Sequence, residues 1–224
     1  MDKAIVTKTR RGSISESIME SFVGMGLDVS SFRKDFDVRN IDQEGDELFS
    51  GEEKVFANCV GITYNAKPSE WNYYIANDVI STNLTAAIAM TSEFVRKTQG
   101  TSGVKTIFHI GSLWSRKHAT NGAVYTASKA GLAHYVSCIA KDLDIAYPGE
   151  YVVIGVHPGN VKGTPLTKEV QRTLAENRGF SQEGIKELYE ETITPLEIGN
   201  VLSDMVGNKW LSGENIYLGN NDKR

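Results

Sequence analysis

Hydrophobic residues along this chain alternate between short continuous runs and longer stretches with helical spacing. The continuous runs lie at residues 3–8, 26–32, 53–61, 104–112, 151–159 and 215–220. Helical spacing occupies residues 13–26, 69–97, 123–146 and 194–207. A strand that is apolar at successive positions is buried on both faces, and its alternation with helices is typical of a parallel sheet. We therefore predict a doubly wound parallel α/β sheet flanked by helices.

The chain has no internal repeat or low-complexity linker, and we expect a single domain over residues 1–224. One connection is unusually short. Residues 28–52 leave little room for two full crossover helices between strands. Either the second strand runs almost directly into Asp35-Phe36-Asp37-Val38, or one helix is reduced to a turn.

Composition and charge exclude several classes of function. The 224 residues are 40% hydrophobic and 23% charged, and the net charge of −4 argues against a partner that is a nucleic acid or an anionic membrane. Cys59 and Cys138 have no metal-ligand spacing, so we expect no metal site and two reduced, buried thiols. Neither a leader segment nor an apolar run of membrane-spanning length is present, which favours a cytoplasmic protein with a small-molecule ligand.

Basic residues and a glycine follow the first two predicted strands. Gly12 opens the first helix, whose N-terminus presents unpaired N–H groups to an anion such as phosphate. Arg10, Arg11 and Arg33 lie where the ribose end of a dinucleotide would sit, and arginine accommodates a 2′-phosphate. The alternatives are a plain strand-to-helix turn and cations exposed on the surface.

A serine, a tyrosine and a lysine form the strongest candidate for chemistry. Ser112 ends the strand at 104–112, and Tyr125 and Lys129 lie on one face of the following helix. Only about one free tyrosine in a thousand is ionised at pH 7, and a nearby ammonium favours the phenolate. Tyr125 would then act as a general acid or base, while Ser112 would stabilise charge on the substrate oxygen. This set suits a carbonyl/alcohol interconversion in which a nicotinamide cofactor carries the hydride.

These residues resemble the short-chain dehydrogenase/reductase family in its compact form, and the resemblance runs nearly end to end. It includes Asn58-Cys59-Val60-Gly61, Asn83, the Tyr125/Lys129 pair, residues 157–161 and residues 211–220. The resemblance implies a Rossmann-type sheet, with Tyr125 as the catalytic acid/base and Lys129 lowering its pKa and binding the nicotinamide ribose. It further implies that Ser112 orients the substrate and that Asn83 organises a proton-relay water.

The resemblance also implies a set of cofactor-binding residues and departs from the family at two of the positions around Gly12. The set comprises Thr7, Arg10, Arg11, Gly12, Ile14, Arg33, Asp37, Val38, Asn58, Gly61, Lys129, Pro158, Gly159 and Val161. Asp37 and Val38 would form the adenine pocket. Lys8 and Ile14 stand where the family has glycines, and their bulk affects the turn and the packing of the first helix. Arg11 and Arg33 resemble NADP-preferring members, so we favour NADP(H) over NAD(H).

The remaining segments give weaker signals. Residues 163–192 lie where the family carries its substrate lid, although their Glu/Lys mixture also suits a solvated helix face. His109 and His157 lie inside apolar strands and are interpreted as core residues. The resemblance implies a homodimer or homotetramer through the helices that carry Asn83 and Tyr125.

We therefore predict an NADP(H)-dependent reductase or dehydrogenase for a small carbonyl/alcohol pair. The alternative is a non-catalytic dinucleotide-binding regulator or scaffold with the same fold, which the altered residues around Gly12 would favour. A nucleotide-sugar epimerase or dehydratase would need a larger C-terminal region than this chain has.

Overall fold

A six-stranded parallel sheet forms the centre of the computed structural model, which describes residues 1–7, 12–32, 36–41, 48–117, 121–178, 181, 183 and 192–219. The strand order is β2-β1-β3-β4-β5-β6, and every neighbouring pair is parallel. The strands are β1 (Lys3–Val6), β2 (Asp28–Ser31), β3 (Glu53–Asn58), β4 (Lys105–Ile110), β5 (Tyr151–Pro158) and β6 (Asn215–Leu218). The predicted doubly wound sheet is confirmed.

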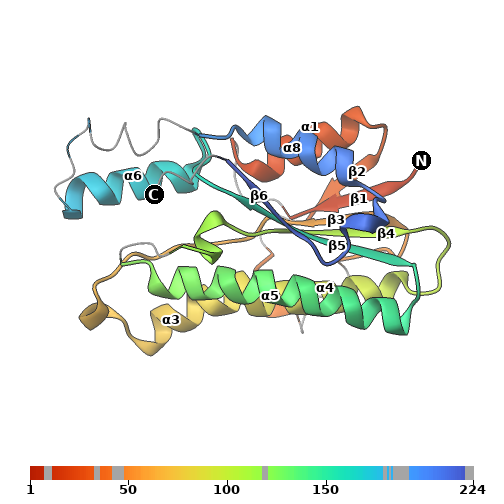
Figure 1. Cartoon of the computed structure of the whole chain (residues 1–224), viewed down its shortest axis with the longest axis horizontal. Coiled ribbons are helices and arrows are strands. Elements are labelled where there is room, and N and C mark those ends of the chain that lie inside the picture. The colour runs from red at the N-terminus through yellow and green to blue at the C-terminus, as the bar shows by residue number, and fades with distance from the viewer. Residues whose placement is uncertain are drawn as a thin grey trace.

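Helices cover both faces of the sheet (Figure 1). Helices α1 (Ile14–Gly24) and α8 (Pro195–Met205) lie together on one face. Helices α4 (Ala86–Thr98) and α5 (Ala123–Ala146) lie on the other, and α3 (Tyr73–Ile80) leads into α4 through a π-helical turn at Ser81–Thr85. Helix α6 (Pro165–Arg178) extends beyond the ends of the strands.

Successive residues of each central strand enter different cores. In β1, Ala4 and Val6 join the apolar cluster under α1 and α8, whereas Ile5 joins the cluster under α4 and α5. In β3, Phe56 likewise points to the second cluster, between residues that point to the first. Because successive strand side chains alternate between faces, a sheet covered on both sides needs these continuous apolar runs.

The connection after β2 contains a short 3₁₀ turn among its described residues. It spans Val38–Asn40, and the Asp37 carboxylate caps it by accepting the N–H of Arg39. The rings of Phe32, Phe49 and Phe56 pack edge to face or stacked, with centroids 5.1–6.3 Å apart. Aromatic side chains thus cover the sheet beside this turn, and β2 is an edge strand of the described sheet.

The two cysteines are free thiols, but the prediction that both are buried is wrong for one of them. Cys59 is partly buried at the end of β3, whereas Cys138 is exposed on α5, where its Sγ lies 3.5 Å from His134 Nε2. Among the described residues, no group of three His, Cys, Asp or Glu side chains is placed to hold a metal ion. Nor does the described part of the chain contain a helix long and apolar enough to cross a membrane.

Candidate active site

The sheet order reverses at β1, which lies between β2 and β3, and ligands of open α/β sheets bind beyond the carboxyl ends of strands at such a point. Buried polar residues gather there. Thr7 follows β1, and its Oγ1 accepts the N–H of Cys59 at 2.7 Å. Asn58 ends β3, with its Oδ1 accepting the N–H of Val60 at 3.1 Å and its Nδ2 lying 3.3 Å from His109 Nδ1. These bonds hold the ends of two neighbouring strands in register.

Asn83 links the segment after β3 to helix α5. It lies in the π-helical turn and is almost fully buried. Its Oδ1 accepts the N–H of Ile62 at 2.8 Å, and its Nδ2 donates to Ile62 O and to Ser128 Oγ, each at 2.9 Å. π-Helical turns inside α-helices are common at functional sites, and this one places a fully bonded amide against the chain beside Gly61.

Lys129 lies in the same buried space. Its Nζ donates to Ile110 O at 3.0 Å, so its position is fixed by the end of β4. A Cβ atom built on Gly61 would lie 3.2 Å from Nζ and 3.6 Å from Asn83 Oδ1, so the missing side chain leaves room for the ammonium group. Burial lowers the pKa of Lys129 to about 8.

Tyr125 and Lys129 both lie on the buried face of α5, as the spacing predicts. Lys129 Nζ lies 6.0 Å from the centroid of the Tyr125 ring. The prediction that Lys129 lowers the pKa of Tyr125 is wrong for this structure: burial raises the pKa of Tyr125, and the bond with Ser112 opposes that change. The physical reason is that Ile110 O holds the ammonium while low-dielectric surroundings disfavour the phenolate.

Ser112 follows β4 and faces Tyr125. Its hydroxyl caps the 3₁₀ turn at Leu113–Ser115 by accepting the N–H of Trp114 at 3.3 Å. The side chain is buried, and its hydrogen bond with Tyr125 offsets only part of the rise in the pKa of that phenol that burial causes. The serine, tyrosine and lysine that the sequence singled out therefore converge at the carboxyl ends of the strands.

Gly12 precedes α1 with a φ of +74°, a conformation that glycine adopts without strain. Its N–H donates to the Glu16 carboxylate at 2.7 Å, so an acidic side chain bonds to the helix N-terminus. Ile14, in place of a family glycine, packs against the apolar cluster under α1 and α8. The bulk of Ile14 is thus absorbed by the core.

Asp37 and Val38 lie beyond β2, at the edge of the sheet. The Asp37 carboxylate accepts bonds from Arg39 Nε and Nη2, which lowers the pKa of Asp37. Arg39 also bonds to Asp78 of α3 at 2.8 Å. The carboxylate of Asp37 in the predicted adenine pocket is therefore already paired with the Arg39 guanidinium. Arg10, Arg11 and Arg33, the basis of the NADP(H) preference, lie outside the described residues.

The loop after β5 completes the site region. Pro158 ends β5, and Gly159 N donates to Leu218 O of β6 at 2.8 Å. Val161 forms an isolated parallel bridge with Ile193 and is buried. Helix α6 follows, so residues 163–178 of the predicted lid leave the strand ends directly from this loop.

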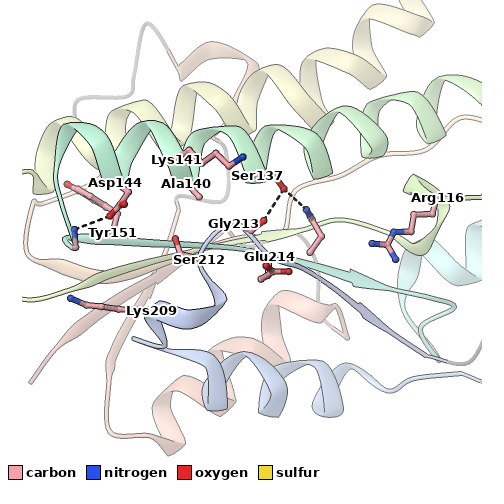
Figure 2. Close-up of a pocket in the computed structure, with 12 residues that line it drawn as sticks. Arg116, Ser137, Ala140, Lys141, Asp144, Tyr151, Lys209, Ser212, Gly213 and Glu214 are labelled. Carbon is pink, nitrogen blue, oxygen red and sulfur yellow. Dashed lines mark hydrogen bonds between the residues drawn. The ribbon is translucent and has the colours of Figure 1, made fainter.

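A groove of about 650 Å³ lies elsewhere, between α5 and the loop before β6. Figure 2 shows Lys141 and Asp144 on its α5 side, Arg116 at one end and Lys209 at the other. None of the residues that the sequence assigns to catalysis or cofactor binding lines this groove. The candidate active site is therefore defined by the bonds at the strand ends, and the groove is a separate feature.

Comparison with known proteins agrees with this arrangement. A family model described as short chain dehydrogenase matches residues 12–175, more than half of the chain. The chain belongs to the short-chain dehydrogenase family. The family match spans Asn83, Ser112, Tyr125 and Lys129, and membership supports oxidoreduction with a nicotinamide dinucleotide.

Individual relatives are more distant. Ketoacyl reductase HetN of Nostoc sp. (strain PCC 7120) is 27% identical over 180 residues, which cover 78% of this chain and 57% of that protein. The chain thus spans little more than half the length of this curated relative.

Solved structures share the fold at low sequence identity. A variant of actinorhodin polyketide ketoreductase with NADPH superposes with a TM-score of 0.85 at 19% identity, over 97% of this chain and 95% of that one. Ligand-free aldohexose dehydrogenase of Thermoplasma acidophilum gives 0.80 at 20% identity, over 97% and 92%. A Brucella melitensis 3-oxoacyl-[acyl-carrier protein] reductase in complex with NAD gives 0.74 at 20% identity, over 96% and 94%.

Proposed function

We propose that this short-chain dehydrogenase is an NADP(H)-dependent reductase or dehydrogenase that interconverts a small carbonyl compound and its alcohol. The observation that carries the proposal is the convergence of Ser112, Tyr125 and Lys129 in one buried space, with Asn83 bonded beside them. The named relatives, which include ketoacyl, polyketide and 3-oxoacyl reductases and an aldohexose dehydrogenase, support the same class of reaction.

The residues present fit a nicotinamide dinucleotide. Lys129 Nζ, which lies against Gly61, would hold ribose hydroxyls, and the N–H of Gly12 would face the pyrophosphate. Pro158, Gly159 and Val161 would border the nicotinamide, and Thr7, Asn58 and Ile14 would shape the floor between strand ends. The bound cofactor supplies or accepts the hydride.

The chain's own residues would handle the proton. Ser112 would donate a hydrogen bond to the substrate oxygen, and Tyr125 would deliver a proton to that oxygen during reduction or remove it during oxidation. A tyrosine whose pKa burial has raised is protonated at neutral pH, which suits the reductive direction. Lys129 would hold positive charge beside the phenolate that forms.

The preference for NADP(H) and the assembly are further parts of the proposal. Arg11 and Arg33 support the 2′-phosphate on sequence grounds alone. The homodimer or homotetramer through the helices that carry Asn83 and Tyr125 likewise rests on the resemblance to the family, because single exposed apolar side chains such as Ile88 and Ile145 are ordinary on a protein surface. The cytoplasmic location stays a prediction.

The alternative function, a dinucleotide-responsive regulator or scaffold, has one structural observation in its favour. The Glu16 carboxylate bonds to the Gly12 N–H, the group that a pyrophosphate would otherwise use. Repulsion between this carboxylate and a phosphate would weaken cofactor binding.

A titration of the protein with NADPH and with NADH, followed by nicotinamide fluorescence, and a turnover assay together separate the two functions. Micromolar binding with a preference for NADPH, followed by turnover of a 3-oxoacyl thioester, a polyketide-like ketone or an aldohexose, is expected for the reductase. Nucleotide binding without turnover of any of these substrates would overturn the reductase and favour the regulator or scaffold, and absence of binding to either nucleotide would overturn both.

A further inference from the structure

A buried histidine on β5 is bonded to the backbone of Ser112. His157 is fully buried, and its Nδ1 lies 3.2 Å from Ser112 N, which donates to it. Its other nitrogen, Nε2, lies 2.7 Å from Oδ1 of Asn215, the first residue of β6. The imidazole therefore connects the candidate catalytic serine to the last strand of the sheet.

Asn215 fixes which nitrogen of His157 carries the proton. The Asn215 Nδ2 donates to Ala133 O at 3.0 Å and to Ser137 Oγ at 3.1 Å. A backbone carbonyl can only accept, so the amide oxygen must face His157, and Nε2 must be the protonated nitrogen. Burial also lowers the pKa of His157 to about 4, so the ring is neutral at physiological pH.

The neutral ring leaves Nδ1 as a hydrogen-bond acceptor. The Ser112 N–H points to this lone pair, and the Ser115 hydroxyl lies 3.4 Å from the same nitrogen. Ser112 O, also 3.4 Å from Nδ1, cannot bond to it in this tautomer because both atoms are acceptors. The direction of the serine backbone is therefore set by the N–H···Nδ1 bond.

Two glycines make room for this arrangement. A Cβ atom on Gly111 would lie 2.1 Å from His157 Nδ1, and one on Gly155 would lie 2.3 Å from Asn215 Oδ1. The imidazole also stacks on Tyr217, with centroids 4.6 Å apart and planes at 19°. Neither glycine has a positive φ, so it is the close approach of the histidine and asparagine side chains that requires them.

We propose that His157, oriented by Asn215, is a positioning residue that holds the backbone of Ser112 and so aims the serine hydroxyl at the substrate oxygen beside Tyr125. The catalytic part of this role rests on the function proposed above. The competing explanation is that His157 only fills space and ties β5 to β6.

Two variants separate these explanations. The amide oxygen of His157→Asn stands near the position of Nδ1 and still accepts from Ser112, but it loses the bond to Asn215. His157→Gln keeps a donor near the position of Nε2 and more of the volume, but it loses the acceptor for Ser112. Both variants lose the imidazole ring that stacks on Tyr217.

If His157 is a positioning residue, the variant with the higher kcat should be the less stable of the two. Because small misplacements of a catalytic group are costly, kcat should fall at least about tenfold in His157→Gln and less than about threefold in His157→Asn. The cofactor KM should not change in either variant, and thermal stability should be lower in His157→Asn. A purely structural histidine would instead give the higher kcat in the more stable His157→Gln, and that result would overturn the proposal.

A measurement without turnover keeps this proposal separate from the proposed function. The sequence has two Gly-Ser pairs, Gly12-Ser13 and Gly111-Ser112, so labelling glycine carbonyl carbon and serine nitrogen yields two amide resonances. The Ser112 resonance should shift in His157→Gln and stay close to the native position in His157→Asn, with Ser13 as the internal control. An unshifted Ser112 resonance in His157→Gln overturns the positioning role, whereas an inactive native protein with the expected shift overturns the reductase alone.

Discussion

Lys129 Nζ lies 6.0 Å from the centroid of the Tyr125 ring while it donates a 3.0 Å bond to Ile110 O. The pair is one turn apart on α5, and both side chains are buried. Burial disfavours the charged form of each group, so the pKa of Lys129 is lowered and that of Tyr125 is raised. The lysine thus keeps a charge beside the tyrosine at a cost to the stability of the fold.

Replacing this lysine should stabilise the protein in a pH-dependent way. The pKa of Lys129 is about 8 in the folded state, against 10.5 for an ordinary lysine, so the folded protein binds fewer protons between these values. The native protein therefore gains stability as pH rises through this window. At pH 7, Lys129→Met should be more stable by about 1–3 kcal/mol, and its advantage should shrink toward pH 10.

Urea unfolding of the native protein and Lys129→Met at pH 7, 8, 9 and 10 measures this difference. Lys141→Met, which removes an exposed lysine from the same helix, is the matched control. A stability difference between native protein and Lys129→Met that grows with pH would contradict the account.

Removing the charge of Glu16 should tighten cofactor binding. The Glu16 carboxylate accepts the Gly12 N–H, and a phosphate at the same helix terminus would be repelled by it. Glu16→Gln keeps an acceptor without the charge and should lower the Kd for NADPH about two- to fivefold. Fluorescence titration measures the Kd, with Glu20→Gln on the exposed part of α1 as the control. Weaker binding by Glu16→Gln than by Glu20→Gln would show that the carboxylate assists the phosphate.

The contact between α1 and α8 depends on Gly199. A Cβ atom there would lie 2.7 Å from Ser17 O of the facing helix, and backbone cannot move aside cheaply. Gly199→Ala should therefore destabilise the protein by about 1–3 kcal/mol, although alanine is the better helix former.

Gly24→Ala is the comparison for this prediction, because Gly24 ends α1 with open space around its Cβ position. It should be neutral or stabilising by up to about 1 kcal/mol. Equal changes in the free energy of unfolding for the two substitutions would contradict this prediction, because they would mean that α1 and α8 can move apart to accept a Cβ atom at Gly199 without cost.

Strands and helices were largely predictable from the sequence because the sheet is buried on both faces. Runs such as residues 151–159 are apolar at successive positions for that reason, and β5 occupies Tyr151–Pro158. The helix starts were less predictable. The stretch at 69–97 begins its helix at Tyr73, because the Asn72 side chain caps it by accepting the N–H of Ile75.

The sequence predicted that the candidate residues Tyr125 and Lys129 would lie together, but it did not predict their pKa values. The i to i+4 spacing placed Tyr125 and Lys129 on one face, but it carried no information on burial, which sets the direction of the pKa of Tyr125. His157 was interpreted as a core residue, and nothing in its local sequence indicates its bond to Ser112 from a distant strand. Gly111 and Gly155 leave room for that imidazole and for Asn215, but only the structure shows this contact, because the residues are far apart in the sequence.

The central claim is that Tyr125 is the acid/base of an NADP(H)-dependent reaction, and Tyr125→Phe tests it most directly. The substitution removes the hydroxyl and keeps the ring against Lys129. The account predicts that turnover of the best carbonyl substrate is lost, while the Kd for NADPH measured by fluorescence remains within about twofold of the native value. Turnover close to the native rate in Tyr125→Phe would contradict it.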